Sequence, residues 1–322
     1  MADIQILAIG NAIMDVIAPV SDDVLASHGI AKGGMTLVDE DAAIALTGAV
    51  ADAGPVEIAG GSGANTIVGA AALGATTAYM GVVKNDEMGA RFIDGMRTAG
   101  VNFDACVRVS GPATARCIIM VTPDGERSMN TFLGASVGFG KKDLDEDLIA
   151  SAGITYLEGY LFDSDDAKAA FVKAAEIARA AGNKVALTLS DAFCVDRHRE
   201  SFQHLVEHHI DILFANESEI TSLYETDFDS AALQIADAGI IGALTRSEKG
   251  SVIIHGLHKH LVDVYPVEKV VDTTGAGDQY AAGFLAAYAR GEALDVCGRW
   301  GSACAAEVIS HYGARPERDI TL

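Results

Sequence analysis

The sequence is poor in basic residues: it has 23 Lys and Arg against 45 Asp and Glu, which gives a formal net charge of −22. No run of basic residues occurs along the chain. Proteins that bind a nucleic-acid backbone or an anionic membrane surface do so with clustered Lys and Arg. We therefore expect no nucleic-acid partner and no membrane partner. A small anionic ligand is compatible with this charge, because local donors decide its binding.

Long apolar runs are also absent, since no stretch reaches the roughly 18 uninterrupted apolar residues of a membrane helix. The N-terminus, MADIQILAIGNAIMD, lacks the basic segment of a signal peptide and looks like a first core strand. The five cysteines are odd in number, widely spaced and never arranged as C-x-x-C, which indicates free thiols in a reducing compartment. These absences predict a cytoplasmic protein.

Small residues are abundant, with 34 glycines and an apolar content of 50% that includes only 6% aromatics. Small side chains allow helices to pack closely on a sheet, and here short apolar runs alternate with longer helical patterns. This predicts an α/β fold with a doubly wound, mostly parallel sheet flanked by helices and ligands at the carboxyl ends of the strands. The predicted core strands are Ile4–Ile9, Thr77–Val83, Ile154–Leu157, Val185–Leu189, Ile212–Phe214, Ile241–Thr245 and Ser251–Ile254.

Two inserts interrupt this alternation, at about residues 17–58 and 107–132. In the second, Pro123-Asp124-Gly125 predicts a turn between two hairpin strands at residues 115–121 and 127–131. We expect both inserts to build a small β-sheet lid on a single domain that spans residues 1–322. Arg116 and Arg127 are local positive charges in this lid. They are suited to closing on a phosphate group, or are merely solvated strand charges.

The most specific motif is VVDTTGAGDQYAAGFL, at residues 270–285. It predicts a short extended segment that ends at Asp272, a Gly-Ala-Gly turn, and then a helix that carries Asp278 in its first turn. Amides at a helix N-terminus bind anions, and a nearby carboxylate can accept a proton from an alcohol. The pattern suits phosphoryl transfer to a hydroxyl group. The structural alternative is a glycine-rich helix cap.

A second glycine-rich segment, GGSGANTIVGAAALG, occupies residues 60–74. It is not a dinucleotide fingerprint, because Thr66 stands where the third glycine is required. It is not a Walker A loop either, because no Gly-Lys-Ser/Thr follows it. Gly60 and Gly61 could instead form a hinge, and Asn65 could offer its amide to hydroxyl groups of a substrate.

Together these two motifs resemble the two signatures of the ribokinase-like (PfkB) family of carbohydrate and nucleoside kinases. Shorter motifs agree in order and distance: Asn11 with Asp15 after the first strand, an N-x-x-E motif at residues 216–219, and TRSEKG at residues 245–250. The resemblance extends along nearly the whole chain and implies the ribokinase-like fold. It also implies a kinase that uses ATP and Mg²⁺.

The resemblance implies a role for several residues by their position. Asp278 is the implied base that activates the substrate hydroxyl, with the amides of Gly275, Ala276 and Gly277 as its anion hole. The implied substrate-binding residues are Asn11, Asp15, Gly61, Ser62, Asn65 and Leu161. The implied ATP- and Mg²⁺-binding residues are Asn216, Glu219, Thr245, Ser247, Gly250 and Arg127. Asp272, Thr274 and the chain near Gly313 form a candidate monovalent-cation site, with K⁺ as the ion.

Asn216 and Glu219 also have a structural interpretation. They lie one helical turn apart, a spacing that suits either a shared ion or a capping pair at a helix N-terminus. Magnesium keeps several waters, so direct ligation by both side chains is not required.

The acceptor is less well defined than the chemistry. Ser62 replaces the usual lysine of ribokinases, and GNAIMD, VSDDVLASHGIAKGGMTLVDE and LTLSDAFCVDRHRE are more similar to adenosine kinases. Apolar walls for a base are expected from Met35, Leu37, Val38, Tyr160, Leu161, Phe162 and Phe193. We favour phosphorylation of a nucleoside, with adenosine converted to AMP. A sugar or sugar-acid kinase (ribose, fructose or 2-keto-3-deoxygluconate type) and a non-catalytic sensor are the alternatives, and both a monomer and a homodimer stay open.

Overall fold

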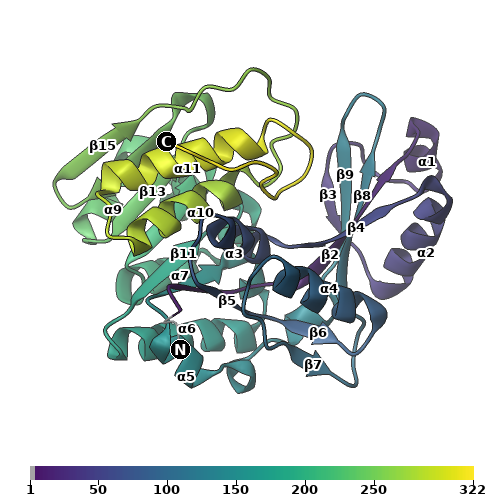
Figure 1. Cartoon of the computed structure of the whole chain (residues 1–322), viewed down its shortest axis with the longest axis horizontal. Coiled ribbons are helices and arrows are strands. Elements are labelled where there is room, and N and C mark those ends of the chain that lie inside the picture. Colours follow the sequence, from purple (N-terminus) through teal and green to yellow (C-terminus); the bar gives the residue numbers. More distant parts are fainter. Residues whose placement is uncertain (1–3) are drawn as a thin grey trace.

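The computed structural model describes residues 4–322 and shows a large domain around a central sheet, with a smaller sheet beside it (Figure 1). The central sheet has the strand order β15-β14-β13-β12-β11-β10-β1-β5. Strands β13 to β5 in this order are parallel, whereas β14 and β15 are antiparallel. The strands are β1 (Ile6–Ile9), β5 (Thr77–Met80), β10 (Ile154–Glu158), β11 (Lys184–Thr188), β12 (Ile212–Asn216), β13 (Ile241–Thr245), β14 (Ser251–His255) and β15 (His258–Val262). The predicted fold class is confirmed.

Helices cover both faces of the central sheet, so alternate residues of its strands enter two separate cores. Leu7 and Ile9 of β1 belong to one core, and Ile6 and Ala8 to the other. The first core packs against α5 (Glu146–Ser151), α6 (Asp165–Ala180), α7 (Ala192–His208), α8 (Glu217–Tyr224) and α9 (Phe228–Asp237). The second packs against α3 (Ser62–Ala72), α4 (Glu87–Thr98), α10 (Ala276–Ala289) and α11 (Leu294–Val308). Within residues 4–322, no helix is both long and apolar enough to cross a bilayer.

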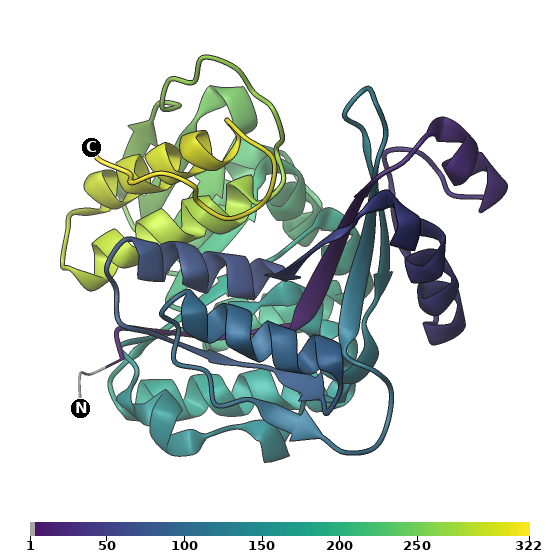
Figure 2. The same ribbon diagram turned by 45° about the vertical axis from the view of Figure 1, so that its right-hand side comes forward.

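The smaller sheet has the strand order β3-β9-β8-β2-β4 and draws on both predicted inserts. Its strands are β2 (Ile13–Pro19), β3 (Met35–Leu37), β4 (Val56–Gly60), β8 (Ala115–Val121) and β9 (Arg127–Phe132). The hairpin β8–β9 follows the prediction, but β2 starts at Ile13, before the predicted boundary of the first insert. Helices α1 (Asp22–Ser27) and α2 (Glu40–Val50) lie on its outer face, away from the large domain (Figure 2).

Two predicted strands differ in the structure. The predicted strand Thr77–Val83 is divided at Gly81, where an added Cβ would lie 3.0 Å from the Gly10 carbonyl oxygen. After this point β6 (Val82–Lys84) leaves the central sheet and pairs with β7 (Cys106–Arg108). The chain before Asp272 is irregular, because its amides bond to the end of α11 through the Ile309 carbonyl oxygen instead of joining a sheet.

Helices α3 and α10 pack in very close contact beside the centre of the molecule. A Cβ added to Gly69 of α3 would lie 2.0 Å from Oε1 of Gln279 and 2.8 Å from Cβ of Ala282. The Gln279 side chain cannot move away freely, because its Nε2 donates to the carbonyl oxygens of Asn65 at 3.0 Å and Ala314 at 2.9 Å. The small residues of the second glycine-rich motif are therefore required for this helix contact.

We expect Gly69→Ala to lower the free energy of unfolding by about 1–3 kcal/mol, because the added methyl overpacks the α3–α10 contact. Gly48, on the exposed side of α2, is the matched control, since an added Cβ there meets nothing within 4 Å. Gly48→Ala should be neutral or should stabilise by about 0.5–1 kcal/mol through helix propensity. Urea unfolding of both variants measures the difference, and equal effects of the two changes would contradict the packing argument.

Candidate active site

Asp278 lies in the first turn of α10, and both of its carboxylate oxygens accept hydrogen bonds from the first turn of α3. Ser62 Oγ donates to Oδ1 at 2.6 Å, and Asn65 Nδ2 donates to Oδ2 at 3.2 Å. Burial raises the pKa of Asp278 to about 6, although both hydrogen bonds act to lower it. Such a carboxylate is ionised at neutral pH and remains basic enough to accept a proton.

The glycine turn before Asp278 has the geometry of an anion site at a helix N-terminus. Gly275 is the N-cap of α10 with φ 78°, and a Cβ there would lie 2.7 Å from Cα of Ala314. A Cβ on Gly277 would meet nothing within 4 Å, so neither packing nor φ accounts for that glycine, and a ligand can approach the backbone there. The Ala276 amide donates to the Thr273 carbonyl oxygen at 3.2 Å, so this predicted anion-hole donor is already engaged.

Asp15 lies on the face of the small sheet that is opposite to α1 and α2, which we call the inner face. Its carboxylate packs against the backbone of Gly60, where an added Cβ would lie 2.2 Å from Oδ2 of Asp15. Burial raises the pKa of Asp15 to about 7, opposed by the nearby charges of Arg315 and Arg127. The charge of Asp278 adds to the rise, so Asp15 and Asp278 lie near enough to interact.

Asn11 is placed differently from its predicted substrate contact. Its side chain is 1% exposed, and its Nδ2 donates to Oε1 of Glu158 at 3.0 Å. Oε2 of Glu158 accepts from the backbone amides of Asn11 at 3.1 Å and Gly63 at 2.8 Å. Glu158 thus joins the Asn11 loop to the start of α3. No motif indicated Glu158, although a carboxylate at the end of a buried strand is an uncommon feature that could have drawn attention to it.

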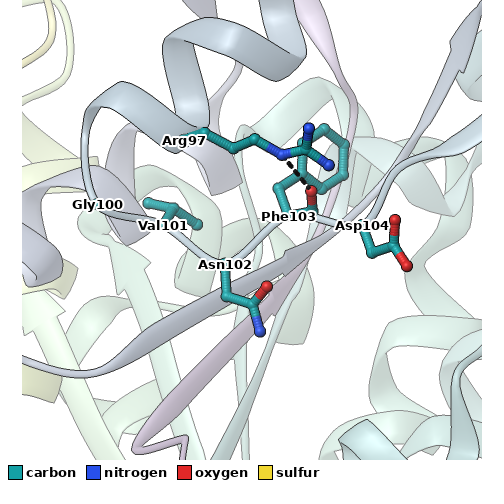
Figure 3. A pocket seen from close by; sticks show the side chains of 6 residues that line it. All are labelled: Arg97, Gly100, Val101, Asn102, Phe103 and Asp104. Carbon is teal, nitrogen blue, oxygen red and sulfur yellow. Dashed lines mark hydrogen bonds between the residues drawn. The ribbon is translucent and has the colours of Figure 1, made fainter.

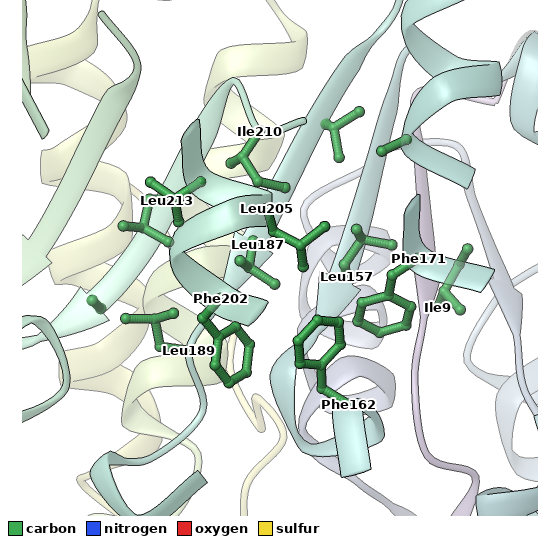
Figure 4. Close-up of a cluster of buried hydrophobic side chains, with 14 of the residues drawn as sticks. Ile9, Leu157, Phe162, Phe171, Leu187, Leu189, Phe202, Leu205, Ile210 and Leu213 are labelled. Atoms are coloured by element: carbon green, nitrogen blue, oxygen red, sulfur yellow. The ribbon is translucent and has the colours of Figure 1, made fainter. Parts of the chain in front are cut away.

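The predicted apolar wall after β10 is largely a core feature. Leu161 is 3% exposed and Phe162 is 1% exposed, and both belong to the core under α6 and α7. Figure 4 shows Phe162 among the buried side chains of this core. The Phe162 ring stacks on Phe202 with centroids 4.6 Å apart. Neither side chain can line an open surface, so the structure does not support substrate contact by Leu161. The Tyr160 hydroxyl donates to the Ser190 carbonyl oxygen at 3.2 Å.

Asn216 and Glu219 form the capping pair that was the structural alternative. The Asn216 side chain accepts from the Glu219 amide at 2.9 Å, and the Asn216 amide donates to Oε2 of Glu219 at 3.0 Å. Burial raises the pKa of Glu219 to about 7, with the charges of Asp191 and Asp278 acting in the same direction and the hydrogen bonds from Asn216 opposing it. Asp191, at the start of α7, is an acidic neighbour that the sequence analysis did not select. Asn216 and Glu219 can therefore cap α8 and at the same time lie near Asp191 and Asp278.

The loop at residues 245–250 connects β13 and β14 and contains unusual backbone conformations. Ser247 has φ 51° and Gly250 has φ 77°, and a Cβ on Gly250 would lie 2.1 Å from the Val262 carbonyl oxygen. Arg246 of this loop donates to Glu217 through Nε at 3.1 Å and NH2 at 2.9 Å. The positive charge of this loop is therefore partly neutralised, and the amides of Arg246, Lys249 and Gly250 bond to carbonyl oxygens within the loop.

Arg127 reaches from β9 to the loop before the glycine turn. Its NH1 donates to Oδ2 of Asp272 at 2.7 Å, and the two side chains are 10% and 6% exposed. Asp272 also accepts from Thr274 N at 2.9 Å, Thr274 Oγ1 at 2.7 Å and Gly313 N at 3.1 Å. Burial alone would raise the pKa of Asp272, but these donors and the Arg127 charge lower it.

The predicted monovalent-cation site does not fit this arrangement. Four donors already occupy the Asp272 carboxylate, and one of them is a guanidinium, which repels a second cation. Arg127 thus supplies the positive charge that K⁺ would have supplied at Asp272. Thr274 donates to Asp272 through its amide and its hydroxyl group, and Gly313 donates through its amide.

A surface hollow elsewhere on the chain is unrelated to these residues (Figure 3). It is lined by the segment Gly100–Asp104 and by Arg97, whose Nε donates to the Phe103 carbonyl oxygen at 3.1 Å. None of the predicted site residues lines it. The candidate site is therefore the cluster of carboxylates, amides and arginines around Asp278.

The model of the pfkB family carbohydrate kinases matches residues 4–320 of this sequence. The chain belongs to the pfkB family. It is therefore a phosphotransferase that acts on an alcohol group of a nucleoside or a sugar, and the family implies ATP and usually Mg²⁺. Over 96% of its length, the chain is 29% identical to an adenosine kinase of Saccharomyces cerevisiae, of which the match covers 95%.

Solved structures of two relatives extend this comparison. The adenosine kinase from Sinorhizobium meliloti is 45% identical, with a TM-score of 0.90 over 99% of this chain and 97% of that one. A probable sugar kinase from Rhizobium etli is 43% identical, with the same TM-score and the same coverage. These relatives support a nucleoside or sugar kinase and leave the acceptor open.

The carboxylates of this PfkB kinase fit a magnesium ion that is held largely through water. The charges of Asp191 and Asp278 contribute to the raised pKa of Glu219, so three carboxyl groups lie near enough to interact with one cation. No group of three or more metal-ligating side chains is assembled among residues 4–322. Phosphate oxygens and waters would thus complete the coordination, as is usual for Mg²⁺.

Glu158 should make the stability of the protein depend on pH. Burial raises its pKa to about 7 from an ordinary 4.5, so its contribution to stability is present below about pH 4.5 and is lost as the pH rises through about 7. Glu158→Gln keeps an acceptor for the two backbone amides without a charge, and the Asn11 amide can flip to pair with it. The variant should gain stability relative to the parent between pH 5 and pH 8, by at most about 3 kcal/mol.

Urea unfolding of the parent and of Glu158→Gln at pH 5 and at pH 8 measures this gain in stability. Glu268→Gln, at an exposed position, is the control and should show no such change. A pH-independent difference between Glu158→Gln and the parent would show that Glu158 is already ionised in the folded protein without cost.

Proposed function

We propose that this protein is an adenosine kinase, which transfers the γ-phosphate of ATP to the 5′-hydroxyl of adenosine to give AMP and ADP. The observation that carries this proposal is an apolar surface directly beside Asp15. A free sugar has no aromatic base to place on such a surface, whereas a nucleoside must place its base against one. The 45% identity to the Sinorhizobium meliloti adenosine kinase supports the same acceptor.

The strand register of the small sheet defines this surface on its inner face. The row that contains Asp15 runs across all five strands as Leu37, Thr131, Cys117, Asp15 and Ile58. The next row is apolar throughout and consists of Met35, Met129, Ile119, Ile17 and Val56. The side chains near the two sheet edges are well exposed, as Met35 is 43%, Leu37 45%, Ile58 39% and Val56 57% exposed. Exposed apolar side chains beside the carboxyl group of Asp15 suit the aromatic base of a nucleoside.

The proposed chemistry uses groups that the fold brings together. ATP supplies the transferable phosphoryl group when it is bound, and Mg²⁺ neutralises part of its charge. Asp278 accepts the proton of the attacking hydroxyl, while Asp15 and Asn65 hold the ribose. The amides at Gly275 and Gly277 face the developing negative charge. Arg127 can exchange Asp272 for phosphate oxygens, because the lid strand carries it into the same region.

We infer that the small sheet acts as a lid within one protomer. Its outer face is covered by α1 and α2, which pack on Val16, Ala18 and Met120. Its inner face is turned toward Asp272 through Arg127. If the small sheets of two protomers packed face to face, either the outer face or the inner face of each sheet would have to be uncovered.

The acceptor is tested by ADP release with adenosine, other nucleosides, ribose, fructose and 2-keto-3-deoxygluconate. We expect turnover with adenosine, and a loss of about 10²–10⁴-fold in Asp278→Asn as for removal of a general base. Phosphorylation of free sugars alone would overturn the nucleoside proposal and leave the kinase assignment intact. Binding of ligands without any ADP release would instead indicate a sensor.

Leu37→Ser tests the base-binding surface separately from the chemistry. The loss of part of one leucine contact should raise KM for adenosine about 5-fold, with kcat and KM for ATP unchanged. Leu257→Ser is the matched control, because Leu257 is fully exposed in the turn between β14 and β15. If both variants keep the parental KM for adenosine, the base does not lie on the inner face.

A further inference from the structure

Arg315 is a half-buried cation next to the candidate site that no sequence motif indicated. Its Nε donates to Oδ1 of Asn65 at 3.3 Å, and its NH2 lies 3.8 Å from Sδ of Met96. The other end of the Asn65 amide donates to Oδ2 of Asp278 at 3.2 Å. Arg315, Asn65 and Asp278 therefore form a continuous hydrogen-bonded chain.

The backbone around Arg315 is fixed to the glycine turn. The Gly313 amide donates to Oδ2 of Asp272 at 3.1 Å, and the Ala314 carbonyl oxygen accepts from Gln279 Nε2 at 2.9 Å. The tight approach of Ala314 to Gly275 adds a steric contact on the same side. The position of the guanidinium is thus set by the same loop that carries the predicted anion hole.

The orientation of the Asn65 amide depends on both of its neighbours. Arginine can only donate, and an ionised carboxylate can only accept. With the carbonyl end toward Arg315 and the NH₂ end toward Asp278, both contacts are favourable. In the flipped orientation, the NH₂ group of Asn65 would face the guanidinium of Arg315, so that two donors meet. Its carbonyl oxygen would face the carboxylate of Asp278, so that two acceptors meet. Without Arg315, one of these two constraints on the amide is lost.

We propose that Arg315 is a positioning residue that orients the Asn65 amide toward Asp278 and thereby holds the proposed base in place for the substrate hydroxyl. This rests on the proposed kinase function, in which Asp278 accepts the hydroxyl proton. Arg315 acts through Asn65 and does not touch the transferred phosphoryl group. Its removal should therefore reduce the rate of transfer and leave the affinity for ATP unchanged.

A double-mutant cycle between Arg315→Met and Asn65→Ala tests this inference with adenosine as acceptor. Arg315→Met should lower kcat about 10-fold, as expected for one hydrogen bond to a charged group, with KM for ATP unchanged. The double variant should have a kcat within about 2-fold of that of Asn65→Ala, because Arg315 reaches Asp278 only through Asn65. The charge of Arg315 also acts on Asp15, and loss of that effect should appear in KM for adenosine and not in kcat. Arg318→Met is the control, since Arg318 is exposed in the same segment.

Multiplicative losses in the double variant, or an equal loss in Arg318→Met, would overturn the inference. A rise in KM for ATP as large as the fall in kcat would do the same, because it would indicate a general disturbance of the fold. Arg315→Leu, which also removes the donor and keeps an apolar side chain against Met96, replaces Arg315→Met in the cycle if the latter does not fold. Activity that survives Asp278→Asn would contradict the proposed function itself, and so the two failures are distinguishable.

Discussion

The close approach of α3 and α10 is the contact on which the site depends. Gly69 allows it, because any side chain at this position would collide with Gln279 and Ala282. The contact brings the first turns of both helices together, so that Ser62 and Asn65 reach Asp278 although they lie far from it in the sequence. The abundance of glycine and alanine in α3 is therefore a requirement of the site as well as of core packing.

Burial of acidic groups gives this site its electrostatic character. Burial raises the pKa values of Asp15, Glu158 and Glu219 to about 7 and that of Asp278 to about 6. Against them the structure places two arginines, Arg127 and Arg315, from distant segments of the chain. A site with this balance suits a polyanion such as ATP only together with a divalent cation that offsets part of the negative charge. The raised pKa values also mean that the ionised, reactive form of the site requires neutral or higher pH.

Sequence patterns predicted the parallel sheet, the hairpin β8–β9 and the helix that carries Asp278, because these depend on local periodicity and turn chemistry. They failed where a residue's environment comes from a distant segment. Leu161 looked like a pocket residue but is covered by core helices, and Asn11 is held by Glu158 across the sheet. Arg315 follows no motif and gains its contact only because Gln279 and Asp272 fix the C-terminal segment.

The contact between Arg127 and Asp272 explains how the small sheet can affect the chemistry without contributing the base. Asp272 is joined to Thr274 and Gly313, and these flank the glycine turn and the segment that carries Arg315. Movement of β9 would move Arg127 and would therefore change the charge beside the anion hole. It would also disturb the segment that carries Arg315, which bonds to Asn65. Under the proposed function, a base on the inner face would contact Met129 and Thr131 of β9, the strand that carries Arg127. Occupation of the acceptor site would then be coupled to the arrangement of the groups that act on phosphate.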